Sequence, residues 1–329
     1  MNTQSNFMMC RERVYNESSR EFLLARISGS EQENDLSVPP NCNGYGRIRH
    51  FKRFLDTDWY DPLPMDPMSK SLTISYEDMV KAQVFQLASC NLHCWYCFVP
   101  DSLKVGQTTS TSWFTAEQMI KMFAEEYPSG LRLLDLSGGN PELSPEWLID
   151  TMRALEKIGL EDHVYLWSDD TLTTDYFFKY LDKYEIQYIK DYPHYGKVGC
   201  FKGFDEESFA FNANLDSRLF EKQFELFKRY LDVGLDIYGY VTFTTKNIDG
   251  IDAKINNFIK RLCNIHPLLP LRIIPLKIVM FSPVEHRMLS SHEIAMKNQI
   301  LVHEEWRKQL CSIFSYEQRM LKICDIPLF

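Results

Sequence analysis

The chain has 329 residues, which is enough to bury one large core, and single-domain α/β barrels often reach this length. Its 36 basic and 45 acidic residues give a net charge of −9, which argues against a protein built mainly to coat nucleic acid. No apolar run reaches the roughly 18 residues of a membrane span. Residues 1–6 lack the basic-then-apolar pattern of a signal peptide. Nine cysteines without such a signal indicate a reducing compartment, so a cytoplasmic location is expected.

Residues 1–75 differ in composition from the rest of the chain. They are rich in Asn, Ser, Pro and charge. Their prolines are Pro39, Pro40, Pro62, Pro64 and Pro67. This composition predicts an irregular N-terminal extension, wrapped on the core or partly disordered, and places the core domain at 76–329.

Strand-like and helix-like segments alternate from residue 76 onward, a pattern typical of a parallel sheet covered by helices. Strands are expected at 82–87, 131–136, 164–167, 197–203, 237–242 and 271–279. The expected helices begin near Thr115, Ser144, Asp175, Phe220, Ile251 and His292. Thr115 and Gln118 have the spacing of a capping box. Six strand–helix units permit either a partial barrel or an open doubly wound sheet.

Three cysteines lie close together just after the first expected strand. Cys90, Cys94 and Cys97 have the spacing C-x3-C-x2-C. Three thiolates on one short loop can hold three irons of a cubic [4Fe–4S] cluster and leave the fourth iron open for chemistry. One alternative is an accidental spacing. Another is a zinc site with His93 as fourth ligand, although structural zinc usually draws on two paired knuckles and no second C-x2-C exists. The other cysteines are scattered, which favours a single cluster; they are Cys10, Cys42, Cys200, Cys263, Cys311 and Cys324.

This cysteine run, with Tyr96 just before the third thiol, resembles the cluster loop of the radical S-adenosylmethionine (radical SAM) superfamily. The chain looks closest to the glycyl-radical activating enzymes, such as the pyruvate formate-lyase activating enzyme. The resemblance implies a partial (β/α)6 barrel, one [4Fe–4S] cluster on the three cysteines, and S-adenosylmethionine (SAM) chelated at the open iron. It also implies reductive cleavage of SAM to a 5′-deoxyadenosyl radical that takes a hydrogen atom from a substrate. Reduction of the cluster requires an electron donor such as flavodoxin or ferredoxin.

A second motif follows the strand expected at 131–136. Gly138, Gly139 and Asn140 resemble the Gly-Gly-Glu-Pro motif that holds the methionine amino group of SAM in this superfamily. Glycine lets the backbone approach a ligand closely. Asn140 stands where Glu is usual and keeps an acceptor without the charge, and Glu142 is a candidate to compensate. A plain tight turn is the alternative. Asn140→Ala is expected to weaken SAM binding and leave the cluster intact.

Further SAM contacts are implied in the cysteine loop and at the ends of later strands. Tyr96 is similar to the family residue near the adenine, where simple packing is the alternative. Ser168 and Asp169 follow the third strand, where the family places polar groups near the ribose, and where a helix cap would look similar. Lys202 resembles the lysine of an Asp-Leu-Lys segment in the activating enzymes, with Cys200 in place of the Asp. A surface lysine is the alternative.

The sequence constrains the substrate only loosely. The likeness to activating enzymes implies a glycine in a partner protein. A peptide, nucleotide or RNA is an alternative, and so is a cluster-binding protein without SAM cleavage. The segment 46–54 mixes basic and aromatic residues that could grip phosphates, although a charged run is usually a solvated face. Arg272 or Lys277 faces the site, depending on strand register. No catalytic residue is assigned.

Overall fold

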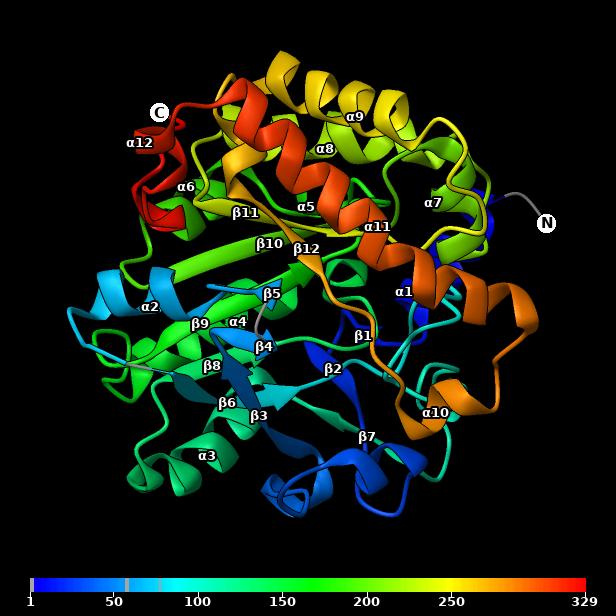
Figure 1. The fold of residues 1–329 in the computed structure, drawn as a ribbon. Coiled ribbons are helices and arrows are strands. Elements are labelled where there is room, and N and C mark those ends of the chain that lie inside the picture. Colours follow the sequence, from blue (N-terminus) through cyan, green and yellow to red (C-terminus); the bar gives the residue numbers. More distant parts are fainter. Residues whose placement is uncertain (1–2, 57–58, 77) are drawn as a thin grey trace.

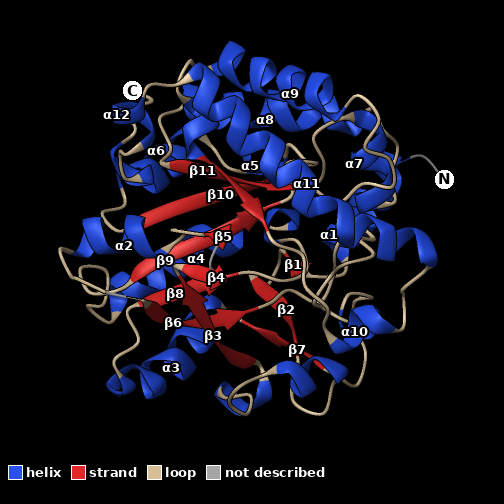
Figure 2. Cartoon of the chain, in the orientation of Figure 1, coloured by secondary structure: helices blue, strands red, loops and turns tan. Residues whose placement is uncertain are grey.

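The computed structural model describes residues 3–56, 59–76 and 78–329, and its centre is one curled sheet with helices outside it (Figure 1 and Figure 2). In the described chain this sheet has seven strands in the order β12-β11-β10-β9-β8-β6-β3. Neighbours from β6 to β12 are parallel, and β3 joins β6 antiparallel. The strands are β3 (Gly46–Lys52), β6 (Met79–Phe85), β8 (Leu133–Leu136), β9 (Tyr165–Asp170), β10 (Tyr195–Phe201), β11 (Ile237–Thr242) and β12 (Ile273–Leu276).

The strand order distinguishes the two architectures that the sequence permitted. In a doubly wound sheet the order of strands reverses at a switch point. Here the six parallel strands follow one another across the sheet in chain order. The sheet therefore curls in one direction, and the predicted α/β fold with a partial (β/α)6 barrel is confirmed.

The helices alternate with the parallel strands and cover the outer face of the sheet. In Figure 1, α8, α9 and α11 lie over the β10–β12 side, where α9 packs against both of the others. Their bounds are α3 (Ala116–Glu126), α4 (Glu146–Lys157), α5 (Tyr176–Tyr180), α6 (Lys183–Asp191), α7 (Glu206–Ala213), α8 (Leu219–Asp232), α9 (Ile251–Ile265), α10 (Ser282–Glu285), α11 (Ser290–Ile313) and α12 (Tyr316–Arg319). The capping box of Thr115 and Gln118 opens α3 as expected. None of the helices in the described part of the chain combines the length and apolarity that crossing a membrane requires.

Much of the described N-terminal quarter forms helices and strands, where the sequence predicted an irregular extension over 1–75. Its elements are α1 (Thr3–Glu12), β1 (Tyr15–Asn16), β2 (Glu21–Ala25), β3, β4 (Phe54–Asp56), β5 (Trp59–Tyr60) and α2 (Met65–Leu72). β2 pairs antiparallel with β7 (Thr111–Phe114), and β3 forms one edge of the barrel sheet. Strands of this kind are stabilised by distant partners rather than by local composition, so composition alone misses them.

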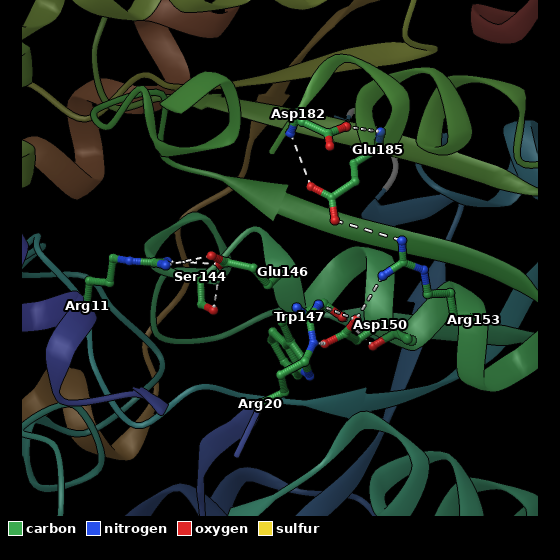
Figure 3. Close-up of polar contacts among 10 residues, drawn as sticks. Arg11, Arg20, Ser144, Glu146, Trp147, Asp150, Arg153, Asp182 and Glu185 are labelled. Atoms are coloured by element: carbon green, nitrogen blue, oxygen red, sulfur yellow. Dashed lines mark hydrogen bonds and ion pairs between the residues drawn. The ribbon is translucent and has the colours of Figure 1, made fainter. Parts of the chain in front are cut away.

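Two arginines fasten the N-terminal segment to α4 (Figure 3). The Arg11 guanidinium donates to both carboxylate oxygens of Glu146, at 2.5 and 2.9 Å, and to Leu143 O at 2.9 Å. Arg20 makes a second, more exposed pair with Asp150 at 2.7 and 3.0 Å. Because Glu146 and Asp150 are one turn apart on α4, the two arginines bind the same face of that helix.

Candidate functional site

The three cysteines of the expected cluster lie on the loop after β6, at the carboxyl ends of the parallel strands. Cys94 is buried, whereas Cys90 and Cys97 are half-buried. The loop turns tightly, since Cys97 N donates to Cys94 O at 3.2 Å and Leu92 N lies 3.4 Å from Cys90 Sγ. In α/β barrels the active site forms at this end of the strands. The cysteine loop therefore occupies the position where such folds bind their ligands.

Contacts from the C-terminal half of the chain fix this loop. Arg287 donates to Cys94 O at 3.3 Å. The ring of Trp95 stacks on His292 with centroids 4.4 Å apart, and its Nε1 donates to Asn212 Oδ1 at 3.1 Å. The positions of the thiols are thus set by packing against α7 and the start of α11.

Two lysines bring positive charge to the thiols. Burial raises the pKa of the Cys90 thiol to about 12, and the ammonium group of Lys104 opposes this rise. Burial also raises the pKa of Cys94, where Lys202 is the main opposing charge. The Lys104 Nζ lies 2.9 Å from Asp101 Oδ1. A [4Fe–4S] cluster with three thiolate ligands carries net negative charge, so these ammonium groups favour its binding.

The Gly-Gly turn after β8 runs directly against the cysteine loop. Asn140 N donates to Ser89 O at 2.9 Å, and Leu87 N donates to Gly138 O at 3.1 Å. A Cβ on Gly139, whose φ is +67°, would lie 2.3 Å from Leu87 O and 2.6 Å from Ser89 O. Glycine is required at this position because the backbone leading into the cysteine loop fills the space.

Asn140 and Glu142 are buried and have partners within the protein. The Asn140 Nδ2 donates to Asn91 Oδ1 at 2.7 Å, and its Oδ1 accepts from Glu142 N at 3.3 Å. The Glu142 carboxylate forms an ion pair with Lys197. Desolvation raises the pKa of Glu142 to about 7, against the lowering effect of Lys197 and with a further rise from Asp170. The turn is therefore linked to the cysteine loop on one side and to β10 on the other.

Three cysteine thiols on one short loop are the donor set that a [4Fe–4S] cluster with one open iron takes. A zinc ion needs four ligands within about 2.0–2.3 Å of one point, and the described residues contain no three His, Cys, Asp or Glu side chains arranged in this way. A cubane cluster needs a wider arrangement because each thiolate binds a different iron. His93, the fourth ligand of the zinc alternative, is exposed.

A protein-family model described as the radical SAM superfamily matches residues 87–256, slightly more than half of the chain. The chain belongs to the radical SAM superfamily. Its cofactors are therefore a [4Fe–4S] cluster and SAM, as the sequence predicted. The family model identifies the superfamily but no branch within it. The likeness to activating enzymes therefore stays a prediction.

Several solved radical SAM structures resemble parts of this chain. Streptococcus suis SuiB bound to S-adenosylmethionine is 14% identical with a TM-score of 0.38, over 53% of this chain and 36% of that one. A histidine-tagged anSMEcpe with bound AdoMet is 17% identical with a TM-score of 0.39, over 57% and 47% of the two chains. The radical SAM methyltransferase TsrM from Kitasatospora setae is 11% identical with a TM-score of 0.33, over 53% and 31%. The chain thus spans less than half of each of these structures. A search of curated proteins finds no match.

Strand register separates the two SAM contacts predicted near the end of β9. Ser168 is paired with Lys197, and its Oγ lies 2.9 Å from Tyr195 OH on the helix-covered face of the sheet. The neighbouring Asp169 accepts a hydrogen bond from Ser137 Oγ at 2.5 Å. Successive residues of a strand point to opposite faces. Of the two predicted radical SAM contacts, only Asp169 therefore faces the barrel interior.

Two other predicted contacts lie beside the cysteine loop. The ammonium group of Lys202 opposes the rise in the pKa of the Cys94 thiol, and the residue is half-buried. Tyr96 is buried, with its OH 3.1 Å from Thr242 Oγ1 at the end of β11. Residues from the loop, β10 and β11 thus meet at one end of the radical SAM barrel.

The two basic residues of the last strand lie elsewhere. Arg272 is buried at the amino end of the β12 region, where Nη1 lies 2.7 Å from Asp236 Oδ1 and Nη2 donates to Ile326 O at 3.0 Å. Lys277 follows β12, with Nζ 5.6 Å from the Trp59 ring centroid. Arg272 therefore secures the C-terminal segment at the opposite end of the sheet from the cysteines.

Some residues of the site were not predicted. Lys104 lies in a polar loop with no recognisable pattern. Cys10 was treated as an isolated cysteine. It lies on α1, and its Sγ donates to Cys90 O at a distance of 3.8 Å. Asn91 bonds Asn140 and also donates to Thr173 Oγ1 at 2.8 Å. Of these three residues, only Asn91 lies inside a recognisable sequence motif, that of the cysteines. Lys104 and Cys10 reach the site only through the fold.

Two surface hollows lie away from the cysteine loop. One has a volume of about 380 Å³ and lies between β12 and the C-terminal segment, with Trp306 and Ile326 among its walls. The other, of about 300 Å³, lies beside α2 and includes Lys70 and Asp325. Neither coincides with the residues that carry the radical SAM chemistry.

Proposed function

We propose that this chain is a radical SAM enzyme that holds one [4Fe–4S] cluster on Cys90, Cys94 and Cys97 and abstracts a hydrogen atom from a substrate. The observation that carries the proposal is the cysteine loop at the carboxyl end of the first parallel strand, next to two ammonium groups. When bound, the cluster supplies the electron that cleaves SAM reductively to a 5′-deoxyadenosyl radical.

The residues of the chain supply position and charge. Lys104 and Lys202 balance the negative charge of the cluster ligands. Gly138 and Gly139 keep the backbone of the turn close to the loop, which leaves the half-buried surface of this turn to SAM. Asp169 is the better placed of the two acceptors at the end of β9, because it faces the interior. The buried ring of Tyr96 forms the remaining wall of the proposed SAM site.

A cleavage assay tests the proposal. Protein reconstituted without oxygen and reduced with dithionite is expected to produce 5′-deoxyadenosine from SAM. Cys90→Ala, Cys94→Ala and Cys97→Ala should each lose the visible absorbance of the cluster, whereas the control Cys263→Ala, on α9, should keep it. Full absorbance in all three variants, or no 5′-deoxyadenosine from cluster-loaded wild type, contradicts the proposal. The second result favours the alternative of a cluster protein without SAM cleavage.

The electron donor and the product are tested in the same system. Replacing dithionite by flavodoxin or ferredoxin with its reductase should sustain cleavage if such a donor serves this enzyme. A mass-spectrometric search of a reacted cell extract separates the two substrate classes left by the sequence. A cleaved or radical-bearing protein glycine supports the activating-enzyme branch, and a modified small molecule or peptide removes it.

A further inference from the structure

The inner face of the barrel carries charged side chains from several strands. Arg47 of β3 is paired in register with Val84, and Val84 with Asp135 of β8. Arg49, two residues on, shares the face of Arg47. Its Nη1 lies 3.4 Å from Asp135 Oδ2. The basic segment at 46–54 is thus not a continuous surface for a nucleic-acid backbone, because alternate residues turn inward.

Arg47 is a buried cation with an unused donor. Arg47 is only 7% exposed, and its Nε has no hydrogen-bond partner among the described residues. The guanidinium lies 5.0 Å from the ring centroid of Phe98, which directly follows Cys97. Desolvation and then the charge of Arg49 lower the pKa of Arg47 to about 10. A buried cation without a full set of partners is costly, which makes Arg47 a candidate to bind an anion.

The neighbouring carboxylates do not accept a hydrogen bond from the unpaired Nε of Arg47. Asp169 accepts from Ser137, and Asp61 accepts from Tyr240 at 3.0 and 3.1 Å. Asp135 uses Oδ2 for Arg49, while its buried Oδ1 has no hydrogen-bond partner in the described chain. The interior wall therefore offers an unused donor on Arg47 and an unused acceptor on Asp135.

Part of this wall is accessible to solvent. The side chain of Arg49 is 31% exposed although it faces the inside of the barrel. Half-buried residues at the end that carries the cysteines are Cys90, Cys97, Phe98, Gly138, Gly139, Asp169 and Lys202. By register, Arg47 is level with Val84 near the end of β6 that leads to the cysteine loop, and the more exposed Arg49 lies two residues farther from that loop. A small anion inside the barrel would meet both guanidinium groups.

We infer that the substrate is a small molecule with a carboxylate or phosphate that binds Arg47 and Arg49. This inference rests on the proposed function and names its substrate class. Arginine suits the role because its planar fork binds both anions through paired hydrogen bonds. Such a ligand balances the charge of the two neighbouring guanidinium groups and gives Arg47 an acceptor, whereas an apolar peptide side chain would do neither.

Binding of simple anions to the cluster-loaded, SAM-bound protein tests the inference. Inorganic phosphate and malate are titrated separately at constant ionic strength, with chloride as the reference, and the thermal midpoint is followed. One of the two should stabilise the wild type in a saturable way, and which one does so distinguishes a phosphate from a carboxylate substrate. Arg47→Gln should weaken that binding at least tenfold, equivalent to about 1.4 kcal/mol. The control Arg218→Gln removes an exposed arginine paired with Asp216 and should bind like the wild type.

The outcomes separate this inference from the proposed function. No saturable stabilisation of the wild type by either anion, or equal binding by Arg47→Gln and the wild type, overturns the inference. If Arg47→Gln does not fold, Arg47→Lys keeps the charge but loses the fork, and it should bind the anion more weakly than the wild type. The assay for 5′-deoxyadenosine on the same preparation is independent. Cleavage without anion binding overturns only the substrate class, and anion binding without cleavage overturns only the enzymatic proposal.

Discussion

At Gly139 a side chain would collide with two backbone carbonyls, those of Leu87 and Ser89, and its φ is positive. Gly139→Ala should therefore displace the turn from the cysteine loop and weaken SAM binding at least tenfold, about 1.4 kcal/mol. The measurement is the dissociation constant of SAM for anaerobically reconstituted protein. Gly159→Ala is the matched control, because its φ is +70° and nothing lies within 4 Å of the added Cβ. That variant should lose about 1–2 kcal/mol of stability and keep its affinity for SAM. Equal affinities in both variants would contradict the proposed role of the turn.

Single residues of the site could be predicted where they belong to a sequence motif. They could not be predicted where their role depends on which face of a strand they occupy. The three cysteines were picked out by their spacing, and the two glycines by the resemblance of their motif to that of the radical SAM superfamily. Ser168 and Asp169 have the same chemistry in the sequence, yet the register of β9 sends them to opposite faces. Such a choice depends on pairing with β8 and β10, and a one-residue slip reverses it.

At the scale of elements, Asn140 connects the turn after β8 to the cysteine loop through Asn91. Asn140→Ala leaves a buried acceptor on Asn91 without its donor, at a cost of about 1–3 kcal/mol. The loop should loosen, so iron and sulfide content per chain should fall together with SAM affinity. The sequence alone led us to expect an intact cluster. Asn256→Ala, which removes a bond to Gln309 between α9 and α11, is the control and should keep its iron. Full iron content in Asn140→Ala would restore the simpler expectation.

Glu142 and Lys197 join the same turn to β10, and their burial makes stability depend on pH. Desolvation raises the pKa of Glu142 from 4.5 to about 7. The folded protein thus binds this proton more tightly than the unfolded chain does. The resulting stabilisation is complete below pH 4.5 and is lost as the pH rises through 7.

Glu142→Gln removes this titration. Between about pH 5 and pH 8 the wild type should lose on the order of 2–3 kcal/mol more stability than the variant. Thermal unfolding of the anaerobic protein at the two pH values measures the difference. Glu117→Gln, which breaks an exposed pair with Lys157, should follow the wild type. Parallel pH curves for the wild type and Glu142→Gln would place the titration elsewhere.

Among the elements, those with local signals were predicted and those with distant partners were not. The strand at 237–242 coincides with β11, and α3 begins at its predicted cap. By contrast β3 pairs with β6 at sequence separations of 27 residues (Lys52 with Met79) to 39 residues (Gly46 with Phe85), a contact with no trace in local composition. Because β3 carries Arg47 and Arg49, the same pairing that was missed also creates the inner charged wall.

For the whole molecule, the N-terminal segment is part of the core and not an appendage. It supplies β3 to the barrel sheet, the Cys10 contact to the cysteine loop, and the arginines that bind α4 (Figure 3). Composition predicted an irregular extension, because prolines are frequent there; Pro39, Pro40, Pro62 and Pro64 lie in the connections between short elements, whereas Pro67 lies inside α2. The strength with which this segment is held can be measured on its two ion pairs.

Arg11 and Arg20 offer a matched comparison of a buried and an exposed ion pair on the same helix. The side chains of Arg11 and Glu146 are 8% and 10% exposed, whereas Arg20 is 47% exposed. Arg11→Ala leaves a buried carboxylate without its partner and should lower the free energy of unfolding by about 3–5 kcal/mol. Arg20→Ala should cost no more than about 1 kcal/mol, because Arg20 is half exposed and Asp150, although only 14% exposed, keeps Arg153 at 3.5 Å.

Urea unfolding followed by tryptophan fluorescence measures both losses. The double variant Arg11→Met/Glu146→Leu should recover most of the stability, since an apolar pair of similar volume removes the uncompensated charge. If the N-terminal segment also supports the cluster, Arg11→Ala will release iron at a urea concentration below that of global unfolding, while Arg20→Ala will not. Equal losses in the two single variants would mean that the segment is held by its strands alone, and that α4 contributes only a surface.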